Sequence, residues 1–201
     1  MVDLMRTQAL LLENSPRMSA TMRQASKDGK LVYSDGFYFK RAKLPTSASG
    51  MQNILLNDDS QKDGYCSISK QKIQQGCAFE CDRLTFKAFA VLTANLGTAD
   101  AASVKYVSIK DLTVVPELMC AELEVTVNGE TKFRVPVNAF TQETYYANSE
   151  KDGINLTAPF FVNDEQLLQF RLHLPQDLSI DSTYTVFVEV AMYGSECRVA
   201  S

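Results

Sequence analysis

Two carboxylates on one predicted strand are the first residues in this chain that could do chemistry. Glu122 and Glu124 alternate with apolar residues, so both point to the same face of that strand. Residues i and i+2 of a strand lie about 7 Å apart, a separation that the two carboxyls of a glycoside hydrolase can have. Almost any strand with a polar face contains such a pair, and the ordinary interpretation is charge that is solvated or paired across strands.

The other reactive residue types form no recognisable motif. His173, the single histidine, alternates with Leu172 and Leu174 and so points away from the apolar face, as a surface or interface residue would. Cys77 and Cys81 would lie about 13 Å apart in an extended strand, too far to share a metal ion. The chain has five cysteines, an odd number, and we expect buried thiols rather than a disulfide framework.

Acidic loop clusters are the remaining candidates for binding an ion. Asp58-Asp59 and Asn163-Asp164-Glu165 could hold Ca²⁺ through oxygen ligands, although turn chemistry explains them equally well. The chain contains no phosphate-binding glycine loop and no nucleophile elbow. We therefore expect neither an enzyme nor a bound cofactor or metal.

Length and composition exclude several classes of protein. The 201 residues suit one domain, and the net charge of −4 shows no overall basic field for nucleic acid. No apolar run approaches the roughly 18 residues that a membrane-spanning helix needs. The absence of tryptophan weakens the case for a sugar-stacking lectin surface.

The charges divide the chain into two unequal parts. Residues 1–43 carry a net charge of +4, which leaves −8 on the remainder. Residues 1–30 are predicted to be an N-terminal arm, either flexible or containing a short helix from Ser15-Pro16 to about Ser26. Such an arm is either a solvated tail or a segment that docks on the acidic body of a neighbouring copy. Its candidate contact residues are Arg6, Arg17, Arg23, Lys27 and Lys30.

From residue 31 to 201 the pattern changes to period-two alternation interrupted by turn residues. This pattern predicts an all-β domain, an antiparallel Greek-key sandwich, specifically a single jelly roll of about eight to ten strands. The longest strand is expected over Arg83 to Asn95, and the first over Val32 to Arg41 with a break at Ser34-Asp35-Gly36. Uneven connections favour this sandwich over an up-and-down barrel.

The residues that flank one turn predict the register of its hairpin. A tight two-residue turn at Asn128-Gly129 would place Val125 opposite Lys132 and mix the apolar and polar faces. Adding one residue pairs Val125 with Phe133 instead. Because a one-residue slip moves every side chain to the other face, we expect a three-residue or bulged hairpin here.

Adjacent aromatic residues predict an interaction surface. Neighbouring residues in a strand point to opposite faces, so one of each pair must be covered by something besides its own core. A second layer of the same chain or a neighbouring subunit could provide that cover. The candidate interface aromatics are Phe37, Phe39, Tyr145, Tyr146, Phe160 and Phe161.

Three segments carry a resemblance to a known class of proteins. They are Gly36 to Pro45 (GFYFKRAKLP), Met51 to Leu56 (MQNILL) and Cys81 to Ala90 (CDRLTFKAFA). With the arm and the order of elements, they resemble single jelly-roll capsid proteins of tailless icosahedral bacteriophages, over roughly residues 30–197. The resemblance implies a vertex (penton) or shell subunit of the virion that is made in the host cytoplasm.

The resemblance also implies partners, while two other functions stay open. Copies of the chain would close a ring, with a pentamer favoured, and would contact other capsid proteins. The arm could face an internal membrane, and no sequence-specific nucleic acid binding is expected. The alternatives are a receptor- or carbohydrate-binding β-sandwich, which predicts a monomer, and a small hydrolase, which predicts a cleft with converging carboxyls.

Overall fold

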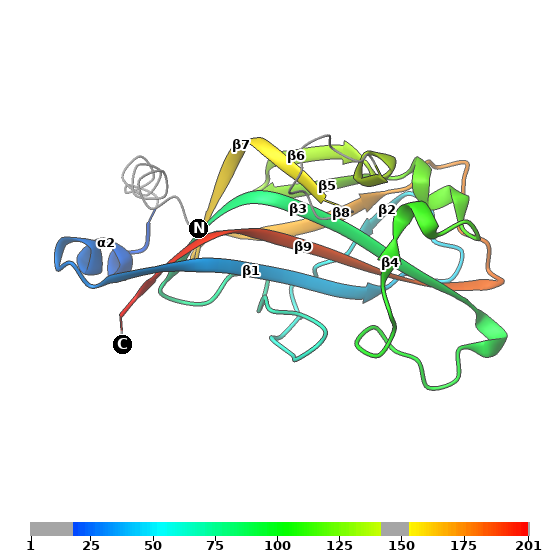
Figure 1. Cartoon of the computed structure of the whole chain (residues 1–201), viewed down its shortest axis with the longest axis horizontal. Helices are drawn as coiled ribbons and strands as arrows, with labels where there is room; N and C mark the ends of the chain where they lie inside the picture. The colour runs from blue at the N-terminus through cyan, green and yellow to red at the C-terminus, as the bar shows by residue number, and fades with distance from the viewer. Residues whose placement is uncertain (1–17, 142–152, 201) are drawn as a thin grey trace.

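The computed structural model describes residues 18–141 and 153–200, which form two antiparallel sheets packed face to face (Figure 1). The larger sheet has the order β1-β9-β3-β4, and β7 also pairs with β3. The smaller sheet has the order β2-β8-β5-β6. The larger sheet contains β1 (Leu31–Lys43), β3 (Cys77–Leu92), β4 (Val107–Ser108), β7 (Gly153–Asn163) and β9 (Tyr184–Val199). The smaller contains β2 (Met51–Asn53), β5 (Glu122–Val127), β6 (Glu130–Pro136) and β8 (Leu168–His173).

Helices are few and short in the described residues. The α-helix α2 (Ala20–Lys27) precedes β1. The 3₁₀ helices are η2 (Thr93–Asn95), η3 (Ile109–Asp111), η4 (Pro116–Cys120) and η5 (Val137–Thr141). None of the helices in this part of the chain is long and apolar enough to cross a membrane.

The chain passes repeatedly from one sheet to the other. The β5–β6 hairpin stays in the smaller sheet and β3–β4 in the larger, while each other pair of consecutive strands is divided between the two sheets. Strands that pair are therefore often distant in sequence, as with β1 and β9. The prediction of an all-β antiparallel sandwich is confirmed.

The core lies between the sheets and follows the predicted alternation. On β8, Leu168, Phe170 and Leu172 are fully buried, and they face the buried side chains of β9. The inward residues of β9 are Val186, Val188, Val190 and Met192. Apolar burial at period two therefore holds each sheet to the other without any disulfide among the described cysteines.

Two predicted strand boundaries are wrong, each for a physical reason. β1 runs without a break through Ser34-Asp35-Gly36, because Gly36 pairs with Gly194 on β9. Glycine is used here because the backbone passes close to a ring: a Cβ on Gly36 would lie 2.7 Å from the Phe79 side chain. β3 begins at Cys77 rather than Arg83. Its first residues pair with β7 on one side and β9 on the other and are buried on both faces, which removes any alternation.

The register predicted for the β5–β6 hairpin is confirmed, with the extra residue in an unexpected place. Val125 pairs with Phe133, as predicted. The turn itself is the two-residue Asn128-Gly129, with φ of 51° and 79°, as a type I′ turn requires. The register then shifts between Val125 and Thr126, so that Lys132 bulges out of β6. Of the two predicted forms, a three-residue loop or a bulged hairpin, the structure has the bulged hairpin, in which a tight turn is followed by the bulge.

Helix α2 belongs to the folded body rather than to a free arm. Met18 and Met22 are buried in a small second core on the outer side of the larger sheet, against Ala78, Phe161 and Cys197. The Ser19 hydroxyl caps the helix by accepting a hydrogen bond from Met22 N at 3.3 Å. The short helix predicted within residues 1–30 is present as α2, and Arg23, Lys27 and Lys30 lie on or beside it. Arg6 and Arg17 fall outside the described residues.

Candidate interaction surface

The outer face of the larger sheet carries a cluster of aromatic rings. Odd-numbered residues of β1 point outward, and the register places Phe37 opposite Tyr193 and Phe39 opposite Ala191. The Phe37 ring centroid lies 5.3 Å from that of Phe39 and 4.8 Å from that of Tyr193. We call Phe37, Phe39 and Tyr193 the aromatic face. Phe37 is 47% exposed, although an aromatic pair of this kind is normally buried.

The guanidinium of Arg83, on β3, borders the aromatic face. The Arg83 guanidinium carbon lies 5.3 Å from the centroid of the Tyr193 ring. The same guanidinium packs on the backbone of Gly153, where a Cβ would lie 2.5 Å from its Nε atom. Only glycine leaves room for this arrangement. The side chain of Arg83 is therefore positioned by one ring and one backbone segment.

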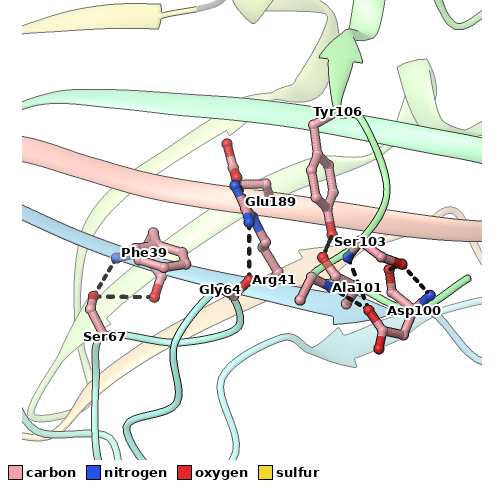
Figure 2. Close-up of polar contacts among 10 residues, drawn as sticks. Phe39, Arg41, Gly64, Ser67, Asp100, Ala101, Ser103, Tyr106 and Glu189 are labelled. Carbon is pink, nitrogen blue, oxygen red and sulfur yellow. Dashed lines mark hydrogen bonds and ion pairs between the residues drawn. The ribbon is translucent and has the colours of Figure 1, made fainter.

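Arg41 joins the outer face to a loop that covers it (Figure 2). Its Nε donates to Glu189 Oε2 at 2.6 Å, and its Nη1 donates to the Gly64 carbonyl at 3.0 Å. Phe39 and Tyr106 lie on either side of it, with ring centroids 5.3 Å and 5.1 Å from its guanidinium carbon. Arg41 is thus held by an ion pair, a carbonyl and two rings at once.

The segment from residue 96 to 106 is folded onto this end of the sheet. Tyr106 donates to the Ala101 carbonyl at 2.8 Å, and burial raises the pKa of its hydroxyl. Tyr65 donates to Asp100 at 2.5 Å, and this hydrogen bond lowers the pKa of that carboxyl. The first contact lies within the segment, the second joins it to the loop that carries Tyr65, and the Tyr106 ring beside Arg41 joins it to β1. The helix α2 lies at the opposite end of the sheet, where β1 begins (Figure 1). The aromatic face lies between α2 at one end of the sheet and the segment from residue 96 to 106 at the other.

One edge of β1 is partly closed by the loop that contains Tyr65 and Ser67. Ser67 N donates to the Phe39 carbonyl at 3.0 Å, and Arg41 N donates to the Tyr65 carbonyl at 2.7 Å. On the inner face, the Lys40 ammonium pairs with the Asp59 carboxylate. Asp59 Oδ2 also accepts from Leu56 N at 2.7 Å, so of the two interpretations of Asp58-Asp59, turn chemistry is the one that the contacts of Asp59 support.

The carboxylates that could have formed a hydrolase pair are engaged in cross-strand contacts. Glu124 Oε2 lies 2.9 Å from His173 Nε2, and its Oε1 accepts from the Thr131 hydroxyl at 2.8 Å. Burial opposes ionisation of Glu124, but the hydrogen bonds from His173 and Thr131 outweigh it and lower its pKa. Glu122 pairs with Arg134 at 2.6 Å. The interpretation of these two residues as paired charge is confirmed.

The sequence could not have shown that His173 faces Glu124. The two residues are 49 positions apart and meet because β5 pairs with β8, with Glu122 directly opposite His173. His173 is expected at a surface or interface, and it lies partly exposed on the polar face of β8 beside this carboxylate. The only available signal was that both residues lie on polar faces of their strands.

The described cysteines and acidic residues form no metal centre. No group of three or more metal-ligating side chains comes together in the residues that the structure describes. All five cysteines are free thiols, and four of them are buried. Burial raises the pKa of the Cys77 thiol to about 11 and that of Cys197 to about 12. These thiols pack as small apolar groups and are poor nucleophiles.

The predicted interface aromatics have three different outcomes. Phe37 and Phe39 lie on the aromatic face. Phe160 and Phe161 are 7% and 8% exposed, because the first packs into the main core and the second under α2. For these two rings the cover is therefore a layer of the same chain, the first of the two alternatives. Tyr145 and Tyr146 lie outside the described residues.

Tyr193 and Tyr106 were missed by the sequence-based prediction. Tyr193 alternates with the buried residues Met192 and Val190 and could have been found as an outward aromatic on β9. Tyr106 reaches Arg41 only through the fold of its loop.

Comparison with known proteins identifies no relative. No family model matches the chain, and no curated protein matches its sequence significantly. The aromatic face and its surroundings are therefore interpreted from their own chemistry.

Proposed function

We propose that this chain is a structural subunit of a virion, a single jelly-roll capsid protein that acts by self-assembly. The strand orders support the jelly roll. Strands β1-β9-β3-β7 pack on β2-β8-β5-β6, and the chain alternates between the sheets, as two Greek keys in one double-sheet sandwich require. Such a rigid body suits a repeated building block.

The exposed aromatic face is the observation that carries the proposal. Aromatic residues and arginine are enriched where proteins contact one another, and Phe37, Tyr193 and Arg83 combine both types on one outward surface. In the described residues, Phe37 is the one aromatic among the large apolar side chains that are exposed. A neighbouring subunit that covers this ring removes it from water.

Charge complementarity favours a second copy of the chain as the neighbour. Residues 1–43, which include β1 and α2, carry a net charge of +4, and the remainder carries a net charge of −8. The aromatic face of one copy, on β1, can therefore meet an acidic surface of the next. Contacts between two different surfaces close a ring, and we favour a pentamer at a vertex.

The same proposal extends to the other partners and to the location. The subunit would lie in an icosahedral virion beside other capsid proteins, after synthesis in the host cytoplasm. Basic residues of the arm, such as Arg6 and Arg17, would face a neighbouring copy or the anionic head groups of an internal membrane. No sequence-specific contact with nucleic acid is proposed.

The oligomeric state of the full chain tests this function. Sedimentation velocity and negative-stain electron microscopy are expected to show a ring or particle. Phe37→Ser should reduce the assembled fraction at least tenfold, since truncating a central aromatic in an interface costs about 2 kcal/mol or more. Leu178→Ser is the matched control, because Leu178 is also exposed but lies on the connection between β8 and β9.

Two outcomes would overturn the proposal. One is a chain that stays monomeric at every concentration, which would favour the alternative of a receptor- or carbohydrate-binding module. The other is an assembly that responds equally to the two substitutions.

A further inference from the structure

We propose that a polar pocket beside helix α2 binds a neutral, hydroxyl-rich ligand, a saccharide. The pocket has a volume of about 490 Å³. It lies where the first residues of α2, the segment from residue 67 to 75 and the turn between β7 and β8 come together. The pocket shares no lining residue with the aromatic face, although Ser67 in its lining hydrogen-bonds the Phe39 backbone, and it is tested separately from self-assembly.

The lining of the pocket is almost entirely polar and is balanced in charge. It contains the three amides of Gln61, Gln74 and Gln75 together with hydroxyl groups, and Ile73 is its one apolar residue in the described part of the chain. Two lysines face two carboxylates, those of Asp164 and Glu165. Amides and hydroxyls both donate and accept hydrogen bonds, as the hydroxyls of a sugar do. A strongly charged ligand of either sign would meet a like charge here.

A buried carboxylate oxygen in this pocket lacks a hydrogen-bond donor. Asp164 is 8% exposed. Its Oδ2 accepts from Gly76 N at 2.6 Å and from the Ser19 hydroxyl at 3.4 Å. Its Oδ1 is buried and has no partner among the residues that the structure describes. A buried acceptor without a donor is costly, and if the carboxylate turns toward the pocket, a ligand hydroxyl can donate to Oδ1 and remove that cost.

One wall of the pocket is a strained turn held in place by hydrogen bonds. Lys70 and Gln71 have φ of 50° and 59°, a left-handed conformation that non-glycine residues rarely adopt. Ser69 and Lys72 exchange backbone hydrogen bonds of 3.1 Å and 2.9 Å across this turn, and Lys70 N donates to the Asp59 carbonyl at 2.7 Å. Two lysines that line the pocket are therefore presented on fixed backbone, which lowers the cost of ordering them on binding.

A second polar pocket adjoins the first and indicates a ligand longer than one sugar. It has a volume of about 440 Å³ and shares Glu165 with the first pocket. Its lining includes Asn128, Lys132 and Gln166. The turn between β7 and β8 thus lies between two neighbouring polar hollows, and a ligand of more than one sugar would reach both.

Saturation-transfer NMR on the full chain tests this site. The probes are glucose, galactose and N-acetylglucosamine, with the disaccharides lactose and chitobiose. We expect transfer to at least one disaccharide, with weaker transfer to its monosaccharide. Asp164→Asn keeps an oxygen for Gly76 N but removes the charge, and it should weaken binding about tenfold, as the loss of a charged hydrogen bond does. Lys72→Ala, at the rim of the pocket, should weaken it as well.

Saturation-transfer NMR on a control variant shows whether a loss of binding is specific to the pocket. Asp177→Asn changes an exposed aspartate beyond β8, at the other end of that strand, and should leave binding unchanged. Thermal unfolding of each variant separates lost binding from lost folding, and Lys72→Ala keeps the test decisive if Asp164→Asn unfolds. The proposal is wrong if no sugar binds, if only inorganic phosphate binds, or if binding survives both pocket substitutions. None of these results depends on whether the chain assembles.

Discussion

At the scale of single residues, Glu124 shows how this chain accommodates a buried charge. Its carboxylate is only 7% exposed, and each of its oxygens has a polar neighbour. Arg171 Nη1 adds a longer contact of 3.6 Å to Oε2. An ionised carboxylate is tolerated in such a place only when partners replace the water that it loses. The partners of Glu124 therefore stabilise its ionised form within the fold.

The Glu124→Gln substitution should destabilise the fold in a pH-dependent way. Because the folded chain lowers the pKa of Glu124, its contribution is present above the ordinary glutamate pKa, about 4.3, and is lost as the pH falls through the lowered value. We expect the variant to lose about 1–3 kcal/mol of unfolding free energy at pH 7. Urea unfolding from pH 3 to 7 should show the difference shrinking in acid.

Glu122→Gln provides the control for this prediction. Glu122 lies on the same face of β5, but its pair with Arg134 is exposed, so the change should be about 0.5 kcal/mol or less. A difference between wild type and Glu124→Gln that is the same at pH 3 and pH 7 would show that ionisation of Glu124 does not stabilise the fold.

At the scale of elements, the long pair β3–β9 depends on a close approach at one glycine. The β3 register shifts between Cys81 and Arg83, which leaves Asp82 as the bulged residue. Gly194 on β9 lies against this bulge, and a Cβ added to it would stand 1.8 Å from the Glu80 carbonyl oxygen. No side chain fits there unless the two strands separate. Since β3 also pairs with β7, the displacement would extend across the larger sheet.

Gly194→Ala should therefore cost about 3 kcal/mol or more of unfolding free energy, because the clash is with backbone that cannot rotate away. Chemical denaturation measures the loss. Gly97→Ala is the matched control: its φ of 52° makes alanine unfavourable by about 1 kcal/mol, but nothing lies within 4 Å of the added Cβ. Equal losses in the two variants would mean that the close approach at Gly194 does not limit the pairing of β3 with β9.

At the scale of the whole molecule, the small core under α2 sets where the arm ends. The helix is attached through Met18 and Met22, which cover Ala78, Phe161 and Cys197 on the larger sheet. Gly29, with φ of 66°, ends the helix, and Lys30 N donates back to the Ala25 carbonyl at 2.9 Å. Met18 and the helix that follows it thus belong to the folded body.

Two truncations should separate folding from assembly. Deleting residues 1–17 is expected to leave the unfolding midpoint within a few degrees of wild type. It should weaken assembly, since Arg6 and Arg17 are then lost from the positively charged part of the chain. Deleting residues 1–27 should also lower the midpoint by roughly 5 °C or more, because Phe161 and Cys197 lose their apolar cover. Differential scanning calorimetry and sedimentation velocity measure the two effects, and unchanged assembly without residues 1–17 would refute the arm as a tie.

The sequence by itself determined the local features of this protein. Period-two alternation placed the buried residues of β5, β8 and β9 correctly, and the need to keep Val125 and Phe133 on one face predicted their pairing. These features depend on neighbours a few positions apart, so the information lies within each segment.

Only the tertiary structure decided which segments meet. β1 and β9 pair across the length of the body, and Glu124 meets His173 through strands that the sequence does not order. The first residues of β3 lack alternation because they are buried on both faces. The aromatic face exists because α2 covers one end of the larger sheet and the segment from residue 96 to 106 covers the other. The physical reason is that distant segments pair and pack according to how much apolar surface each possible arrangement buries over the whole molecule. The residues of a single segment do not contain that information.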